Sequence, residues 1–484
     1  MNVIVICSDT FRQDHLGFLG RQKVFTPNLD RLAGESATFL DFRLCSFPTI
    51  THRIEVFTGR YTFPLMDWGP LPFHYPVLAE VFKHHGFATA IIADNLHLMQ
   101  EGFGFGRGFD TVKDVPGQMH DPFQPDSTPM IDLPCPAEKL EPVPHRLDRY
   151  RRNAFHYRQQ ETNTTEVVFM EAVRWLEKPR EKFFLWIDAF DPHEPWDAPK
   201  DFLAPYPWNP AGDAVFWPHS GKADRYPAAD LENMRSLYKA EVSQTDHYVG
   251  VLMERLRSQN LLENTAVIFC SDHGYYFGEH GLLGKPVKRK LEQPLTIYSE
   301  LGNLPLLVRH PRGVGAGKTI RGLCQPPDLF ATALDFAGIP PVDWAQGKSL
   351  VPRLDGAVPG QRFAVGGIHP RKGNVGCLTV WTDEWCLVYS PIKGLEGSEL
   401  YRADDAGQAQ NVIDRHRDVA RGHFDLLRSW LQGLNVPEAQ QNQLLHGASL
   451  GWWQRMKHRF WMARNRKVYE KQFAGYAART GSSR

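Results

Sequence analysis

Three short apolar runs constrain the fold of this chain most strongly, because each stops abruptly at acidic or histidine residues. They cover residues 3–7, 183–187 and 266–270 and are rich in Val, Ile and Phe. Runs of this length and composition are typical of strands that are buried on both faces of a parallel sheet. The three segments are therefore predicted to be core strands of one parallel sheet.

The polar residues that follow these strands are candidates for a shared site. Asp9 follows the first strand, Asp272 and His273 follow the third, and His193 lies shortly after the second. Ligands bind beyond the carboxyl ends of the strands in open α/β sheets, so residues far apart in sequence are expected to meet at one edge. Two carboxylates and an imidazole are suitable ligands for one divalent cation.

Strand-like and helix-like segments alternate up to about residue 340. Residues 88–93 read as a further strand, after a helix at 77–85. Apolar residues recur at three- and four-residue steps from 231 to 256, which predicts a long amphipathic helix leading into the strand at 266. Repeated helix–strand units predict an α/β fold, with a large, mostly parallel sheet sandwiched by helices.

The sequence changes in character after about residue 360. Short strand-like segments at 377–381 and 385–389, followed by a helix near 416–433, predict a small C-terminal antiparallel sheet. We predict a main α/β domain at 1–365 and a small sheet-plus-helix subdomain at 366–445.

Residues 446–484 form a basic, aromatic tail in which Glu470 is the single acid. Such a segment can lie on an anionic membrane or bind nucleic acid. Nothing else in the chain points to lipid or nucleic acid, so we favour an arm that wraps a neighbouring subunit of a homo-oligomer. We expect no nucleic-acid partner.

Composition narrows the class of protein. Lys plus Arg and Asp plus Glu each total 55, so net charge indicates no polyanionic partner. No apolar run is long enough for a membrane span, and the N-terminus lacks the pattern of a signal peptide. The seven cysteines are scattered and odd in number, which favours reduced thiols and a cytoplasmic location.

Several motifs occur in a characteristic order and together resemble the sulfatase family of the alkaline phosphatase superfamily. The motifs are Asp9-Thr10, RQDHLG at 12–17, TPNLDRLA at 26–33, SDHG at 271–274, GEHG at 278–281 and Gly284-Lys285. The resemblance runs almost from end to end. It implies an alkaline phosphatase-like α/β fold, with residues 1–365 as the catalytic domain.

The family's reactive residue lies in a Cys-x-Pro-x-Arg segment, nine residues before the threonine of a Thr-Gly pair. Its cysteine is oxidised to formylglycine. Counting back from the pair at 58–59 leads to Thr49, with Thr51 in place of the proline and Arg53 in place of the arginine. Formylglycine is therefore not expected. The resemblance implies a threonine nucleophile, as in phosphodiesterase-like branches of the superfamily. Thr49 is the first candidate and Thr51 the second.

The resemblance also implies the ligands of one divalent metal ion. Asp9, Asp272 and His273 would bind it, with Thr49 as the fourth ligand, and Arg53 would hold Thr49 in place. Mixed oxygen and nitrogen ligands suit Mn²⁺ or Zn²⁺, whereas Ca²⁺ is the usual ion of sulfatases.

Four further residues match family positions around the transferred group. His193 and Lys285 would contact that group or protonate the leaving oxygen. His97 stands at the histidine of the family's Gly-Lys-Trp-His run and Asn95 at its lysine, so both are predicted to bind substrate. The missing lysine weakens the case for a pocket of the sulfate type.

These residues predict a metal-dependent hydrolase of phosphate or phosphonate esters that forms a covalent intermediate on Thr49. The substrate would be a small-molecule ester, and no sequence pattern identifies it. The first alternative is a sulfuric ester hydrolase. The second is a non-catalytic relative that binds a sulfated or phosphorylated ligand.

Overall fold

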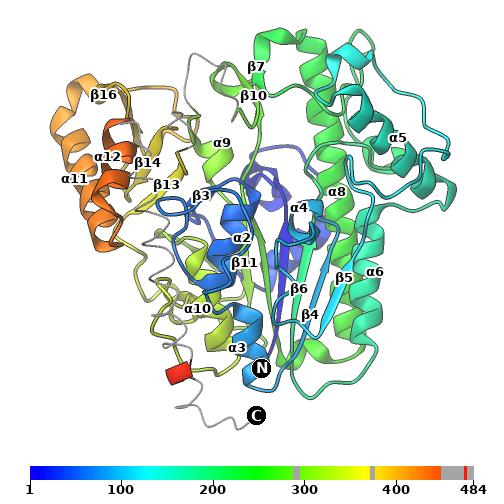
Figure 1. The fold of residues 1–484 in the computed structure, drawn as a ribbon, viewed down its shortest axis with the longest axis horizontal. Coiled ribbons are helices and arrows are strands. Elements are labelled where there is room, and N and C mark those ends of the chain that lie inside the picture. Colours follow the sequence, from blue (N-terminus) through cyan, green and yellow to red (C-terminus); the bar gives the residue numbers. More distant parts are fainter. Residues whose placement is uncertain (287–294, 371–375, 448–473, 477–484) are drawn as a thin grey trace. The chain divides into compact units, whose positions relative to one another are not determined.

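The computed structural model describes residues 1–286, 295–370, 376–447 and 474–476 (Figure 1). Two compact units divide the chain, and both are discontinuous in sequence. The first unit contains residues 1–38, 88–288 and 305–318, and the second contains residues 39–87, 289–304 and 319–484.

This division cuts across the predicted 1–365 domain, because residues 39–87 and 319–365 belong to the second unit. A domain boundary near residue 365 stays a prediction. The predicted arm at 446–484 lies outside the described residues, apart from 446–447 and 474–476.

The first unit is built around one sheet, in which β2, β11, β8, β1, β6, β4 and β5 follow one another. Its strands are β1 Asn2–Ser8, β2 Ala37–Phe39, β4 Ala88–Ala93, β5 Thr111–Asp114, β6 Phe183–Ala189, β8 Thr265–Ser271 and β11 Leu306–Arg309. A small antiparallel sheet joins β7 Gly221–Lys222, β10 Leu282–Gly284 and β9 Tyr276–Phe277.

The main sheet is mostly parallel, as predicted. β1 pairs in parallel with β6 and β8, and β4 pairs in parallel with β5 and β6. β11 is the exception and runs antiparallel to β8 and β2. In register, Ser8 pairs with Ser271 and Ala189, so β1, β6 and β8 end at the same level.

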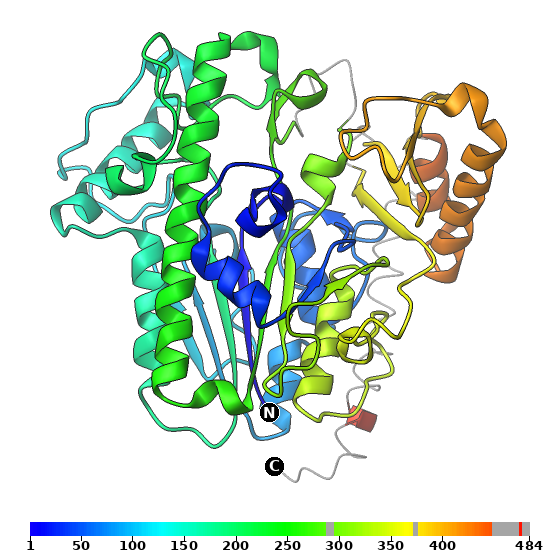
Figure 2. The same cartoon turned by 180° about the vertical axis from the view of Figure 1, so that it is seen from behind.

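The helices of the first unit are α1 Pro27–Gly34, α4 Leu96–Met99, α5 Pro144–Gln159, α6 Thr164–Leu176, α7 Lys200–Leu203 and α8 Ala228–Ser258. Among them, α6 and α8 lie along one face of the main sheet. Alternate strand residues such as Ile4, Ile6 and Phe269 share a buried core with the apolar stripe of α8. Figure 2 shows α8 as the long green helix running along the sheet, and α6 packs beside it.

The second unit contains the smaller sheet, ordered β16, β15, β14, β13, β3. The strands of this unit are β3 Ser46–Phe47, β12 Thr319–Ile320, β13 Ala364–Ile368, β14 Leu378–Trp381, β15 Trp385–Ser390 and β16 Gly394–Arg402, of which β12 is not part of the smaller sheet. Its helices are α2 Thr49–Thr58, α3 Leu78–His84, α9 Ser299–Gly302, α10 Pro327–Phe336, α11 Arg417–Gly433 and α12 Glu438–His446. Leu427 and Leu431 of α11 pack with Val380 and Leu387 of the sheet, so the predicted small antiparallel sheet and its helix are confirmed.

Two further sequence expectations concern membranes and thiols. In the described part of the chain, every helix is too short or too polar to cross a bilayer. The seven cysteines all fall in described segments, where they are buried and none is joined to another by a disulfide.

Candidate metal centre

A buried cluster of possible metal ligands lies at the carboxyl ends of β1 and β8 in the first unit. Asp9 and Asp272 each follow the last residue of their strand directly, and His273 comes next. Ligand atoms of the three side chains lie within 4.8 Å of one another, and none is more than 1% exposed. His273 Nε2 is 3.8 Å from Asp9 Oδ1 and 3.7 Å from Asp272 Oδ2.

These donors fit a divalent cation. Two fully buried carboxylates at this spacing repel each other, and burying their charges is costly unless a cation compensates them. The backbone amides of Thr10 and His273 donate to Asp272 Oδ1 at 3.0 and 2.8 Å, which orients that carboxylate. Two carboxylates with one imidazole suit the ions expected from the sequence.

Asn95 lies just beyond the end of β4 and orients Asp9, which follows β1; β6 lies between these two strands in the sheet. Its Nδ2 donates to Asp9 Oδ2 at 3.0 Å and to Asp188 Oδ1 at 3.1 Å. Asp188 in turn accepts from Trp186 Nε1 at 2.9 Å. The Asn95 oxygen accepts from the backbone amide of His97 and so caps α4. The amide is thus engaged within the chain, and its predicted contact with substrate stays a prediction.

Thr10 connects the cluster to Lys285. The Thr10 hydroxyl donates to Asp9 Oδ1 at 2.9 Å, and Lys285 Nζ lies 3.4 Å from the same hydroxyl oxygen. Thr10 has a φ of +64°, a conformation that is strained for a β-branched residue. Its backbone is held by Asp272 and by the Tyr238 hydroxyl, which donates to the Thr10 carbonyl at 2.8 Å. Strain of this kind is commonly retained at functional sites.

Glu194 lies between Lys285 and His193. Its Oε2 is 2.9 Å from Lys285 Nζ and 3.3 Å from His193 Nδ1. His193 Nδ1 lies 2.6 Å from the carbonyl oxygen of Glu194, which identifies Nδ1 as the protonated nitrogen of the neutral ring. Burial, with a smaller contribution from Lys285, holds the pKa of His193 well below its usual value. At neutral pH the ring is therefore uncharged, with Nε2 as the hydrogen-bond acceptor.

The remaining predicted residues are placed as follows. His97 is half-buried. Its ring centroid lies 6.1 Å from the ring centroid of Phe190, and the Phe190 ring lies 4.2 Å from the His193 ring. Thr49 is the first residue of α2 in the second unit, and both Thr49 and Arg53 are buried there.

The alternative nucleophile, Thr51, also lies in α2, where its hydroxyl donates to the Pro48 carbonyl at 2.7 Å. Arg53 Nη1 lies 3.3 Å from His52 Nδ1. The catalytic roles of Thr49, Thr51 and Arg53 stay predictions.

Glu194 was not identified from the sequence. The sequence did contain a signal for it. Glu194 directly follows His193, just beyond a strand that ends at the predicted site. Its partner Lys285 is 91 residues away along the chain, and no local pattern links the two.

Comparison with known proteins identifies the family. The Sulfatase family profile matches residues 1–339. The ulvan-active sulfatase of Formosa agariphila is 25% identical over 370 residues, which is 72% of this chain and 64% of that relative. Human N-acetylgalactosamine-6-sulfatase is 25% identical over 379 residues, or 73% and 65% of the two chains. The chain thus spans slightly less than two-thirds of the length of these relatives.

The solved structures show a shared fold. The phosphonate monoester hydrolase of Agrobacterium radiobacter has a TM-score of 0.71 at 20% identity, covering 90% of this chain and 96% of that one. The family profile extends over more than half of the chain and includes the segments that carry Asp9, Asp272 and His273. The chain therefore belongs to the sulfatase family, whose members hydrolyse ester bonds.

Proposed function

We propose that this protein is a metal-dependent hydrolase of phosphate or phosphonate esters. The observation that carries the proposal is the buried Asp9–Asp272–His273 cluster, joined through Thr10 to Lys285. The two carboxylates and the imidazole would hold a metal ion, and this ion together with the nearby ammonium group would attract an anionic ester. A divalent ion held by the cluster would polarise the oxygens of the bound ester.

Lys285 would bind the anionic ester from beside the metal ligands. Its ammonium group has three N–H donors, and the structure gives it contacts to Glu194 and Thr10. A third N–H would donate to an ester oxygen or to the leaving oxygen. Glu194 fixes the direction of the ammonium group and neutralises it between turnovers.

His193 would act as a hydrogen-bond acceptor in the resting enzyme. Its Nδ1 proton is held by the Glu194 carbonyl, and its lowered pKa keeps Nε2 unprotonated at neutral pH. Nε2 would accept a proton during ester cleavage and return it later. Acid–base assistance of this kind typically contributes about a hundredfold to ten-thousandfold in rate.

The preference for phosphorus over sulfur rests on Thr49. A formylglycine hydrate expels sulfate when its hemiacetal collapses, whereas a threonine ester has no such exit. After Thr49 Oγ displaces the alcohol, water must attack phosphorus or sulfur directly. The fold likeness to a phosphonate monoester hydrolase is compatible with a phosphorus ester.

A sulfuric ester hydrolase is the competing proposal. It is favoured by the family profile and by relatives whose names describe sulfatases. A non-catalytic protein that binds a sulfated or phosphorylated ligand is the third reading. The connected Lys285, Glu194 and His193 group argues against loss of catalysis, because a binding site alone needs no acceptor nitrogen beside an ammonium group.

The decisive experiment compares p-nitrophenyl esters of phenylphosphonate, a phosphate diester and sulfate. Full-length protein is treated with chelator and then assayed with Mn²⁺, Zn²⁺ or Ca²⁺. We expect metal-dependent turnover with kcat/KM highest for a phosphorus ester. Thr49→Ala should lose roughly a thousandfold or more, and Thr51→Ala should retain most activity.

Other outcomes select between the readings. A higher kcat/KM for the sulfate ester would replace the main proposal by the sulfatase. Background rates with every ester and metal would favour the binding protein. Loss of activity in Thr51→Ala with Thr49→Ala active would move the nucleophile to Thr51.

A further inference from the structure

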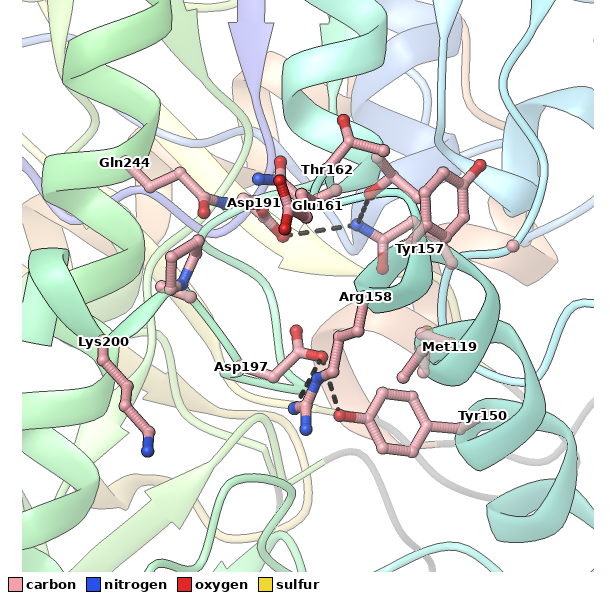
Figure 3. Close-up of a pocket in the computed structure, with 17 residues that line it drawn as sticks. Met119, Tyr150, Tyr157, Arg158, Glu161, Thr162, Asp191, Asp197, Lys200 and Gln244 are labelled. Carbon is pink, nitrogen blue, oxygen red and sulfur yellow. Dashed lines mark hydrogen bonds and ion pairs between the residues drawn. The ribbon is translucent and has the colours of Figure 1, made fainter. Parts of the chain in front are cut away.

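A cavity with several charged and polar lining residues lies in the first unit, separate from the metal centre. It has a volume of about 490 Å³ and is formed by the last turns of α5, the segment 117–119, the start of α6, the segment 197–200 and one residue of α8 (Figure 3). Asp9, Asp272, His273 and Lys285 do not line it. The ester hydrolysis proposed above gives this cavity no role.

Carboxylates are concentrated at this cavity. Asp191 is buried in its wall and Asp197 lies at its rim, while Glu241 is buried behind the lining. Asp191 Oδ2 accepts from Thr165 Oγ1 at 2.5 Å, and Glu241 Oε1 accepts from the Ala198 amide at 2.6 Å. These hydrogen bonds hold the carboxyl groups in place but supply no positive charge to balance them.

Gln244 of α8 provides an independent indication of a ligand. It is 1% exposed, and its Nε2 donates to Asp191 Oδ2 at 2.8 Å and to Glu241 Oε2 at 3.3 Å. At neutral pH the ionised carboxylate of Asp191 can only accept, so the amide nitrogen faces Asp191 and the amide oxygen is directed away from it. Figure 3 shows this side chain reaching the cavity wall next to Asp191. Gln244 Oε1 is buried and accepts no hydrogen bond in the described structure.

A buried acceptor without a donor is unfavourable, so this atom calls for a ligand that donates. Three of the lining side chains, Gln118, Tyr150 and Tyr157, direct their hydrogens to other acceptors. Gln118 Nε2 is directed at Asp94, Thr164 and Asp191. The hydroxyl groups of Tyr150 and Tyr157 donate to Asp197 and to the Pro116 carbonyl. The inner part of the cavity therefore presents acceptors and aromatic surface.

The charge of the cavity also favours a cation. Burial raises the pKa of Asp191 to about 6. Burial, followed by repulsion from Asp191 and Asp197, raises the pKa of Glu241 well above its usual value. Arg158 is a partial counter-ion on the rim, where its Nη2 lies 3.8 Å from Asp197 Oδ2 and the side chain is 55% exposed. A bound cation would relieve the repulsion that remains inside.

The spacing of the carboxylates favours an organic cation over a bare metal ion. Within the described residues, one group of three or more acidic, histidine or cysteine side chains is spaced closely enough to hold a metal ion. It consists of Asp9, Asp272 and His273. The carboxylates of the cavity do not meet that spacing. A cavity of about 490 Å³ has room for carbon atoms beside a charged head, and Met119 and Tyr157 offer apolar contact.

We propose that this cavity binds a small primary alkylammonium ion, whose N–H groups donate to Gln244 Oε1 and to the carboxylates of Asp191 and Asp197. Its alkyl part would lie against Met119 and Tyr157. This site is independent of the proposed esterase activity, and its occupancy can be measured without turnover.

The test is isothermal titration calorimetry of full-length protein with n-butylammonium chloride. Two probes of similar size separate the contributions: n-butanol lacks the charge and tetramethylammonium lacks N–H donors. We expect saturable one-to-one binding of n-butylammonium, with at least about tenfold weaker binding of the other two. Equal binding of all three probes, or no saturable binding of n-butylammonium, would overturn the proposal.

Variants locate the site. Gln244→Met keeps the volume and removes the acceptor, so it should weaken n-butylammonium at least about tenfold. Asp197→Asn, on the rim, should also weaken n-butylammonium binding at least about tenfold. This variant replaces Gln244→Met in the test if Gln244→Met does not fold. Lys200→Gln is the matched control, since it removes a rim cation and should not weaken binding. If both Gln244→Met and Asp197→Asn bind n-butylammonium with unchanged affinity, the proposed site is wrong. If Gln244→Met does not fold, unchanged affinity in Asp197→Asn leads to the same conclusion.

A metal is the remaining occupant to separate. The same titration is run with Ca²⁺ and Mn²⁺ on Asp272→Asn, in which the ligand cluster is impaired. We expect neither ion to compete with n-butylammonium there. If Ca²⁺ or Mn²⁺ competes with n-butylammonium, and Gln244→Met or Asp197→Asn abolishes that competition, the occupant of the cavity is a metal ion instead of an alkylammonium ion.

Discussion

The carboxylate of Glu194 lies 2.9 Å from the ammonium group of Lys285, and both side chains are at least nine-tenths buried. Lys285 also lies within 3.4 Å of the Thr10 hydroxyl, which donates to Asp9. The ion pair therefore connects the segment after β6, through Thr10, to the candidate metal ligand Asp9 after β1. In the proposed mechanism the partners differ in role: Lys285 would bind the substrate, and Glu194 would position Lys285.

Glu194→Gln should lower kcat/KM by about a hundredfold, because a misplaced ammonium group no longer meets the developing charge. Burial raises the pKa of Glu194, so the carboxylate, and with it the ion pair, forms above that raised value and is lost as pH falls through it. Wild-type activity should therefore decline on the acid side at a pH above 4.5. The kcat/KM of the Gln variant should be low and should not change with pH across that range. The pH–rate profiles of the two proteins measure this difference.

Glu194→Asp is the control for this pair, since it keeps the charge and should restore part of the activity. Metal content should be unchanged in both variants. A Gln variant with wild-type rate and pH profile would mean that the ion pair does not assist the reaction.

Asn95→Leu should lower metal affinity by about 10- to 100-fold, the usual effect of losing a residue that orients a ligand. Without the amide, the carboxylates of Asp9 and Asp188 lose the donor they share. Metal titration of the chelator-treated protein measures this directly. If Asn95 instead binds substrate, KM will rise while metal affinity stays at the wild-type value.

Asp272→Asn should reduce both bound metal and turnover, because the remaining pair Asp9 and His273 offers one anionic ligand instead of two. Elemental analysis of the purified variant gives the metal content. Asp126→Asn is a suitable control, since the Asp126 side chain is 97% exposed. Full metal content in Asp272→Asn would contradict the proposed ligand set.

Glu55→Gln should change how stability depends on pH. Glu55 is fully buried in the second unit, and burial raises its pKa to about 7. Between the unfolded pKa near 4.5 and the folded pKa, the native state holds a proton that the unfolded chain has released. The free energy of unfolding therefore falls as pH rises through this window, by up to about 3 kcal/mol from this group.

Denaturant unfolding at pH 5 and pH 7 measures that slope. The Gln variant cannot release the proton, so its stability should change less between the two pH values than that of the wild type. Glutamine Oε1 can keep the bonds from Ser46 Oγ and the Thr62 amide, but its NH2 group cannot accept from the Ser46 amide as Glu55 Oε2 does. The comparison therefore uses the change in stability between the two pH values, to which a constant loss does not contribute. Identical slopes for the two proteins would show that Glu55 does not titrate in this range.

Much of the fold follows from local patterns. Apolar runs with abrupt polar ends predicted β1, β6 and β8, and the three- and four-residue repeat predicted α8. Parallel strands that start in register also end together, so their next residues, Asp9 and Asp272, necessarily approach each other. The antiparallel β11 was not predicted, because a buried run of four residues has no pattern that encodes its direction.

The sequence by itself determined the class of fold, the family and the three clustered candidate metal ligands, because strand periodicity and strand ends depend on neighbouring residues. Only the tertiary structure decided that Glu194 pairs with Lys285, that Asn95 bridges Asp9 and Asp188, and that Gln244 leaves an acceptor in a cavity. Each of these depends on how segments that are distant in sequence pack against one another and on the rotamers that this packing allows. That information is spread over contacts between distant segments, and no short stretch of sequence contains it.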